Sequence, residues 1–125
     1  MKKKILVIED NEQNLYLVTF LLERAGYEVI AARDGIRGIQ TANREIPDLI
    51  LLDIQLPLMD GYTVATRLKE SAVLAHVPIV AVTSYAMTGD REKALVSGCT
   101  GYIVKPINPD TFQTEIETYL VPIQK

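Results

Sequence analysis

Apolar residues gather in short unbroken runs along this chain, without the polar alternation of a half-exposed strand. Residues 5–8, 49–52 and 79–82 are such runs, and each is too short for a helix. A run of this kind predicts a strand that is buried on both faces of a sheet. Residues 102–104 repeat the pattern briefly. Residues 27–32 repeat it less strongly, so we expect them at an edge of the sheet.

Segments with helical spacing separate these runs. Asn11 can cap the first helix, which ends before Gly26, and its inward positions are Leu15, Val18 and Leu22. The other predicted helices include residues 35–44 with Ile36 and Ile39 inward, residues 62–71 with Ala65 and Leu68 inward, and a final helix that packs through Phe112, Ile116, Tyr119 and Leu120.

Residues 88–97 predict a further helix, which Gly98 terminates. The apolar side chains that it can bury are mainly Ala94, Leu95 and Val96. Because so few apolar contacts anchor this helix, we expect it to shift easily.

Five strands that alternate with five helices predict an α/β fold. Parallel strands joined by helices use right-handed crossovers, which cover both faces of the sheet. The expected architecture is therefore an open, doubly wound, five-stranded parallel sheet. Ligands of such sheets bind at the carboxyl ends of the strands, beside the point where the strand order reverses.

The composition is that of one globular domain. A chain of 125 residues with 48% hydrophobic residues can bury a core without disulfides or metals. The formal net charge of −3, with residues 2–4 as the one cationic cluster, argues against nucleic acid as a direct partner. No apolar run approaches the ~20 residues that cross a bilayer, and no signal peptide is evident. Since Cys99 is the only cysteine, we predict a cytoplasmic protein without a disulfide framework.

Strongly polar residues follow four of the predicted strands. Glu9 and Asp10 follow the first strand, Asp53 the third, Thr83 the fourth and Lys105 the fifth. Asp53 alone could simply end a strand, because Asp is a common strand breaker. The other polar strand ends reach the same edge of a parallel sheet, which favours a site. Three carboxylates gathered there repel one another, so one takes up a proton or a cation lies among them.

A divalent cation with a phosphoryl ligand suits this set of side chains. Mg²⁺ prefers oxygen ligands and usually takes one or two carboxylates plus phosphate oxygens, whereas Ca²⁺ demands more ligands; the sequence leaves Mg²⁺ and Mn²⁺ open. Thr83 adds a hydroxyl donor and Lys105 a positive charge on a flexible stem. A carboxylate nucleophile beside a metal and a lysine is typical of phosphoryl transfer.

Taken in order, these residues resemble the response regulator receiver domain of two-component signalling over residues 1–125. The resemblance rests on Glu9-Asp10, Asp53, Pro57, Asp60-Gly61, Thr83, Tyr102 and Lys105-Pro106. It implies a flavodoxin-like (βα)5 fold with the strand order 2-1-3-4-5. Residues 86–107 resemble the receivers of hybrid kinases and of single-domain regulators like DivK more than the receivers of transcription factors.

The resemblance also implies a role for each site residue. These roles are phosphoacceptor for Asp53, catalytic contacts for Thr83 and Lys105, metal binding for Glu9, Asp10, Asp53 and Gln55, switching for Thr83 and Tyr102, and a cis peptide bond before Pro106. Glu9 stands where many relatives carry Asp, and we expect its longer side chain to reach the metal through a water.

The favoured function is a signalling switch that takes a phosphoryl group from a histidine kinase or a histidine phosphotransfer protein and catalyses only its own phosphorylation and dephosphorylation. The resemblance implies that a downstream protein binds the face formed by residues 88–97, residues 102–104 and the final helix. A flavin-binding electron carrier is one alternative, but it needs a neutral phosphate loop where this chain has Glu9 and Asp10. A metal-dependent phosphatase with an Asp nucleophile is the other. Many such enzymes carry a second Asp where this chain has Gln55.

The lifetime of the phosphoryl group depends on how water reaches it. Gln55 and Tyr85, each two residues beyond Asp53 or Thr83, are expected to flank that approach. Neither is an evident general base, and Tyr85 is bulky. We therefore expect a long-lived phosphoryl group.

Overall fold

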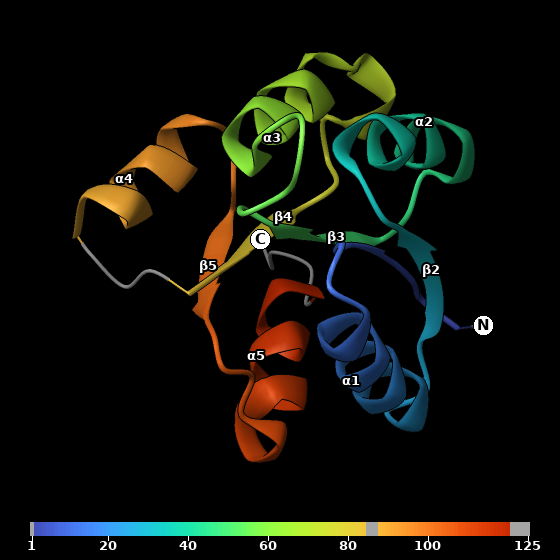
Figure 1. The fold of residues 1–125 in the computed structure, drawn as a ribbon. Helices are drawn as coiled ribbons and strands as arrows, with labels where there is room; N and C mark the ends of the chain where they lie inside the picture. The colour runs from blue at the N-terminus through green and yellow to red at the C-terminus, as the bar shows by residue number, and fades with distance from the viewer. Residues whose placement is uncertain (1, 85–87, 121–125) are drawn as a thin grey trace, which may run out of the picture.

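The structure is a computed structural model, and it describes residues 2–84 and 88–120. The strands are β1 (Lys4–Ile8), β2 (Glu28–Ala32), β3 (Leu49–Asp53), β4 (Ile79–Thr83) and β5 (Gly101–Val104). The helices are α1 (Glu12–Arg24), α2 (Gly35–Glu45), α3 (Gly61–Glu70), α4 (Thr88–Val96) and α5 (Pro109–Leu120), with a short 3₁₀ helix, η1 (Ala72–Leu74). The predicted strands and helices are all present (Figure 1). The sequence pattern therefore predicted every helix and strand of the described residues except η1.

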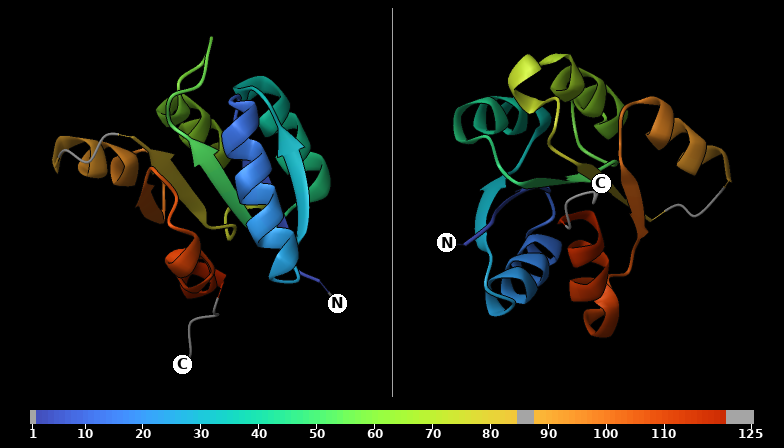
Figure 2. Two further views of the ribbon diagram at one scale, coloured as in Figure 1. Left: turned by 60° about the horizontal axis from the view of Figure 1, so that its bottom comes forward. Right: turned by 180° about the vertical axis from the view of Figure 1, so that it is seen from behind.

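The strands form one parallel sheet in the order β2-β1-β3-β4-β5. This confirms both the doubly wound architecture and the placement of the weak strand β2 at an edge. Helices α1 and α5 lie on one face of the sheet, and α2, α3 and α4 lie on the other (Figures 1 and 2). The order reverses between β1 and β3, so the carboxyl ends of these two strands meet at the point where ligands of such sheets bind.

Each central strand contributes to two hydrophobic cores. Ile5 and Val7 of β1 belong to the core under α1 and α5, whereas Leu6 and Ile8 belong to the core under α2 and α3. Successive side chains of a strand point to opposite faces, so a strand covered on both sides needs an unbroken apolar sequence. This is why the apolar runs located the strands to within one residue at each end.

Helices α1, α2 and α3 each begin directly after a polar residue that caps them. The side chain of Asn11 accepts a hydrogen bond from Asn14 N at the start of α1, as predicted. Asp34 and Asp60 cap α2 and α3 in the same way. These caps satisfy N–H groups that a helix leaves free at its first turn, and they fix where the loops from β2 and β3 end.

Helix α2 packs differently from the prediction. Ile36, expected to point inward, is 54% exposed. The buried face of the helix is instead made of small residues, among them Gly35, Gly38 and Ala42. A Cβ added at Gly38 would lie 2.5 Å from Ile8 Cδ1, so this helix approaches β1 too closely for a larger side chain. The prediction was therefore wrong for Ile36, because the close contact depends on residues with small side chains or none, whereas Ile39 is partly buried and packs against the core under α2 and α3, as predicted.

Helix α4 is anchored even more lightly than its sequence suggested. Ala94 is fully buried, but Leu95 and Val96 are 46% and 88% exposed, which contradicts the prediction that all three pack inward. A second contact comes from Lys93, whose Nζ lies 4.8 Å from the centre of the Tyr62 ring on α3. The exposed pair of apolar side chains leaves α4 with little buried surface to hold it against the sheet.

Two simpler expectations concern the membrane and the cysteine. Among residues 2–84 and 88–120, no helix is long and apolar enough to cross a membrane.

Cys99 is a free, buried thiol. Burial raises the pKa of this thiol to about 11, while Lys69 lowers it less. Cys99 is therefore protonated at neutral pH, as expected for a small buried hydrophobic residue.

Candidate functional site

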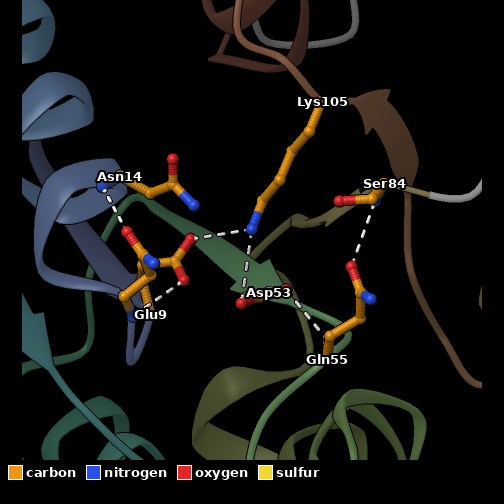
Figure 3. Close-up of polar contacts among 7 residues, drawn as sticks. Glu9, Asn14, Asp53, Gln55, Ser84 and Lys105 are labelled. Atoms are coloured by element: carbon orange, nitrogen blue, oxygen red, sulfur yellow. Dashed lines mark hydrogen bonds and ion pairs between the residues drawn. The ribbon is translucent and has the colours of Figure 1, made fainter.

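Polar residues from four strand ends lie at the carboxyl edge of the sheet. Glu9 and Asp10 follow β1, and one oxygen from each lies within 4.8 Å of an Asp53 oxygen at the end of β3. Lys105 follows β5 and reaches across to the same group (Figure 3). Thr83 ends β4, next to β3 in the sheet, and its side chain is almost fully buried. The structure thus brings together side chains that the sequence analysis singled out separately.

The ammonium group of Lys105 lies between two acids. Its Nζ is 3.2 Å from Glu9 Oε1 and 3.4 Å from Asp53 Oδ2. All three side chains are largely buried, with exposed fractions of 13% for Lys105, 5% for Glu9 and 3% for Asp53. Water screens a buried pair poorly, so the Coulombic attraction within these pairs is stronger than in a surface ion pair, although burying the charges costs desolvation energy. The peptide bond between Lys105 and Pro106 is cis, as the resemblance implied.

Glu9 has a carboxyl group that resists ionisation. Burial is the largest cause, and a side-chain hydrogen bond to Asp53 and the charge of Asp53 add to it. A hydrogen bond from Asn11 N and the charge of Lys105 act in the opposite direction. The result is a pKa of about 7 for Glu9, raised from 4.5. The positive charge of Lys105 therefore does not fully offset the repulsion among the acids. For such a cluster the sequence predicted that either a proton or a cation is taken up.

The loop after β3 aims the Asp53 carboxylate. Gln55 N donates a hydrogen bond of 2.9 Å to Asp53 Oδ1, and Gly61 N donates one of 2.9 Å to Ile54 O. A Cβ on Gly61 would lie 2.5 Å from Ile54 Cα and 2.8 Å from Asp53 O, so only glycine fits where α3 begins. The close approach explains why a glycine follows the capping Asp60.

The side chains of Gln55 and Tyr102, two of the predicted site residues, make contacts outside the cluster of acids. Gln55 is exposed, and its side-chain Oε1 accepts a hydrogen bond of 3.2 Å from Ser84 N, a contact that the sequence analysis missed. Tyr102 is partly buried on β5, in register with Ala81, and packs against the core under α2 and α3. Tyr85, expected to occlude water, lies outside the described residues.

A family model described as "Response regulator receiver domain" matches residues 5–117. The chain belongs to this family. The receiver domain of two-component response regulators is a phosphoacceptor module in signal transduction, so the match supports a signalling switch and gives no support to the phosphatase alternative.

Individual relatives agree with the family match. The polar-differentiation response regulator DivK of Brucella ovis is 44% identical over 120 residues, which cover 96% of this chain and 98% of that protein. The receiver domain of a sensor histidine kinase from Pseudomonas aeruginosa is 33% identical, with a TM-score of 0.89 and coverage of 96% and 98%; its structure holds a magnesium ion in the active site cleft. A chemotaxis response regulator of Vibrio cholerae is 28% identical, with a TM-score of 0.92 and coverage of 96% and 100%.

These relatives bear on the subgroup expected from the sequence. The predicted similarity to DivK is confirmed by the curated relatives, and similarity to a receiver from a sensor kinase is seen among the solved structures. The receiver domain therefore has both kinds of relative that residues 86–107 suggested.

Proposed function

We propose that Asp53 is the residue of this receiver domain that accepts the phosphoryl group. The observation that carries the proposal is the Lys105 ammonium, 3.4 Å from Oδ2 of a carboxylate that is 3% exposed. A buried carboxylate is costly unless it is paired, and the lysine that pairs it can also bind a charged phosphoryl group. Gln55 N holds Oδ1, which leaves Oδ2 as the nucleophile.

The phosphoryl donor is a phosphohistidine of a histidine kinase or of a histidine phosphotransfer protein. Asp53 Oδ2 attacks phosphorus, an O–P bond forms as the N–P bond breaks, and the imidazole keeps the electron pair and takes up a proton. Lys105 neutralises part of the charge on the transferred group. Later hydrolysis releases phosphate and restores the carboxylate, so the chain catalyses only its own phosphorylation and dephosphorylation.

A divalent metal ion fits the donor set. Glu9, Asp10 and Asp53 offer carboxylate oxygens within 4.8 Å of one another, and Mg²⁺ prefers oxygen donors. Asp10, Asp53 and Gln55 would hold Mg²⁺ or Mn²⁺, and Glu9 would reach it through a water. Because Ser84 N engages Gln55 Oε1, the oxygen from Gln55 would be its main-chain carbonyl. A bound ion would supply positive charge that offsets the repulsion between these acids and an incoming phosphoryl group.

Thr83 and Tyr102 are the proposed switch residues. Thr83 lies at the end of β4, beside the end of β3, where its hydroxyl can donate to a phosphoryl oxygen. Tyr102 lies on the adjacent strand β5 and would move when Thr83 moves. The readout face for a protein partner consists of α4, β5 and α5. Three exposed apolar residues support this choice: Leu95, Val96 and Val104.

We also infer that residues 1–125 form one receiver domain. The family model covers residues 5–117, and the core under α1 and α5 contains residues from β1 as well as from α5. The cytoplasmic location and the lack of a nucleic acid partner stay predictions from the sequence.

Labelling with a small phosphoryl donor tests the proposal. Incubation with acetyl phosphate and Mg²⁺ should add one phosphoryl group, detected by intact-protein mass spectrometry. Asp53→Asn should abolish the added mass, whereas Asp110→Asn, the same change at an exposed position of α5, should not. Label that persists in Asp53→Asn and maps to another residue would refute the assignment.

Two further experiments test the role of the metal ion and the phosphatase alternative. Excess EDTA should block labelling, because without a cation the acids repel the incoming phosphate. Full-rate labelling in EDTA would refute the metal role. A protein that labels itself once is a switch, whereas continuous release of phosphate at rates typical of an enzyme would favour the phosphatase alternative.

A further inference from the structure

Gln55 connects the loop after β3 to the end of β4 through both its main chain and its side chain. Its N–H donates to Asp53 Oδ1 at 2.9 Å, and its side-chain Oε1 accepts from Ser84 N at 3.2 Å. Figure 3 shows the side chain extended between the two segments. One exposed residue thus links the proposed phosphoacceptor to the residue that follows the proposed switch threonine.

The orientation of the Gln55 amide is fixed by this contact. The main-chain N–H of Ser84 is a donor only, so it must meet the carbonyl oxygen of the glutamine rather than its NH₂ group. Ser84 N is therefore held by a neutral acceptor in the absence of phosphorylation.

The position of Ser84 N makes the contact relevant to phosphorylation. Asp53 is in register with Val82, and Ser84 lies two residues further along, beyond the carboxyl end of the sheet. The Asp53 carboxylate opens at that same edge. A phosphoryl group on Asp53 brings charged oxygens there, and a charged acceptor forms roughly twice as strong a hydrogen bond as a neutral amide oxygen.

We propose that Gln55 is a positioning residue whose side-chain carbonyl holds Ser84 N in the unphosphorylated protein and releases it when Asp53 is phosphorylated. The inference rests on the proposed role of Asp53. The contact stabilises the resting arrangement of Thr83 and Ser84, so converting the protein to its phosphorylated arrangement costs the free energy of this hydrogen bond. Removing the acceptor lowers that cost.

Two substitutions at Gln55 separate the acceptor from the bulk of the side chain. Gln55→Met keeps a similar length but has no strong acceptor, and Gln55→Glu keeps an acceptor oxygen at the same reach. Gln55 is exposed and its main-chain carbonyl stays in both variants, so neither change opens the core. Equal urea unfolding midpoints establish that both variants are folded.

The first measurement is hydrogen exchange at Ser84 N, followed by NMR without metal or phosphoryl donor. Exchange should be about tenfold faster in Gln55→Met, corresponding to roughly 1.4 kcal/mol for the hydrogen bond, and should stay at the wild-type rate or slower in Gln55→Glu. Equal rates in wild type and Gln55→Met would overturn the inference. This arm does not depend on the role of Asp53.

The second measurement is the affinity for beryllofluoride, an analogue of the phosphoryl group, in Mg²⁺. Gln55→Met should bind beryllofluoride up to about tenfold more tightly than wild type. If Gln55 only supported the structure of the site, this variant would instead bind beryllofluoride more weakly than wild type. If wild type binds beryllofluoride and Gln55→Met binds it equally or more weakly, the inference about Gln55 is overturned, whereas the proposed role of Asp53 is not. Failure of wild type to bind beryllofluoride would instead count against the proposed role of Asp53 and, with it, against release of Ser84 on phosphorylation.

Discussion

Lys105 and Glu9 form the closest ion pair of the site, with Nζ 3.2 Å from Oε1. The two residues directly follow β1 and β5, which are separated in the sheet by β3 and β4. The side chain of Lys105 therefore extends across the carboxyl edge of the sheet, past Asp53, to reach Glu9. A phosphoryl group on Asp53 would compete with Glu9 for this ammonium group, and a metal ion among the acids would take over part of its role.

Stability without metal should fall as pH rises because of Glu9. The pKa of Glu9 in the folded protein is about 7, raised from 4.5. The folded state therefore binds the proton more tightly than the unfolded state, and this contribution is complete below about 4.5 and lost as pH rises through about 7. In EDTA, the free energy of unfolding should decrease between pH 5 and pH 8, by about 3 kcal/mol at most. Urea denaturation at a series of pH values measures it.

The matched control for this pH dependence is Glu9→Gln, which keeps the size of the side chain but cannot titrate. Its profile should be flatter than that of wild type over the same range, and the two curves should differ most at pH 8. Adding Mg²⁺ at pH 8 should recover stability in the wild-type protein, because a cation favours the ionised acids. Parallel pH profiles for the two proteins would show that Glu9 is not the titrating group.

Replacing Lys105 with Met should slow labelling while leaving the fold intact. The aliphatic part of the side chain is retained, but the ammonium group that lies 3.4 Å from Asp53 Oδ2 is lost. Charge-assisted hydrogen bonds contribute about 1.5–3 kcal/mol, so the initial rate with acetyl phosphate should fall roughly tenfold to a hundredfold at saturating Mg²⁺. Lys3→Met removes the same charge from an exposed position and should label normally. Unchanged labelling by Lys105→Met would remove the lysine from the proposed mechanism.

Gly61→Ala should damage both stability and labelling. The added methyl group would meet the backbone of Ile54 and Asp53, which cannot rotate away as a side chain would. We expect a loss of about 1–3 kcal/mol in the free energy of unfolding, with slower labelling because the Asp53 carboxylate is displaced. At Gly89, a Cβ would meet nothing within 4 Å, so Gly89→Ala in α4 should be neutral or stabilising by up to about 1 kcal/mol. Equal urea midpoints for the two variants would contradict this argument.

The fold and the site differ in how much of each the sequence could predict. Strands buried on both faces leave unbroken apolar runs, and polar residues at or directly after the ends of β1, β3 and β5 must meet at one edge. Helix α2 was mispredicted at Ile36 because its packing depends on Gly35 and Gly38, which carry no hydrophobic signal. The hydrogen bond between Gln55 and Ser84 joins loops 29 residues apart, and no local pattern encodes it. Strand ends are thus predictable from sequence, whereas side-chain contacts between loops require the backbone geometry.

Occupation of the site by a phosphoryl group or its analogue should move α4. Among the described side chains of this helix, Ala94 alone is fully buried, and Lys93 adds a contact with Tyr62, so a small change at the end of β4 can displace it. Beryllofluoride with Mg²⁺ should change amide exchange in α4 and β5. Thr83→Ala should still bind beryllofluoride but lose that change, because the hydroxyl that would follow the phosphoryl group is gone. Thr118→Ala, which removes an exposed hydroxyl on α5, should behave as wild type. If exchange in wild-type α4 is the same with and without beryllofluoride, this helix does not report phosphorylation.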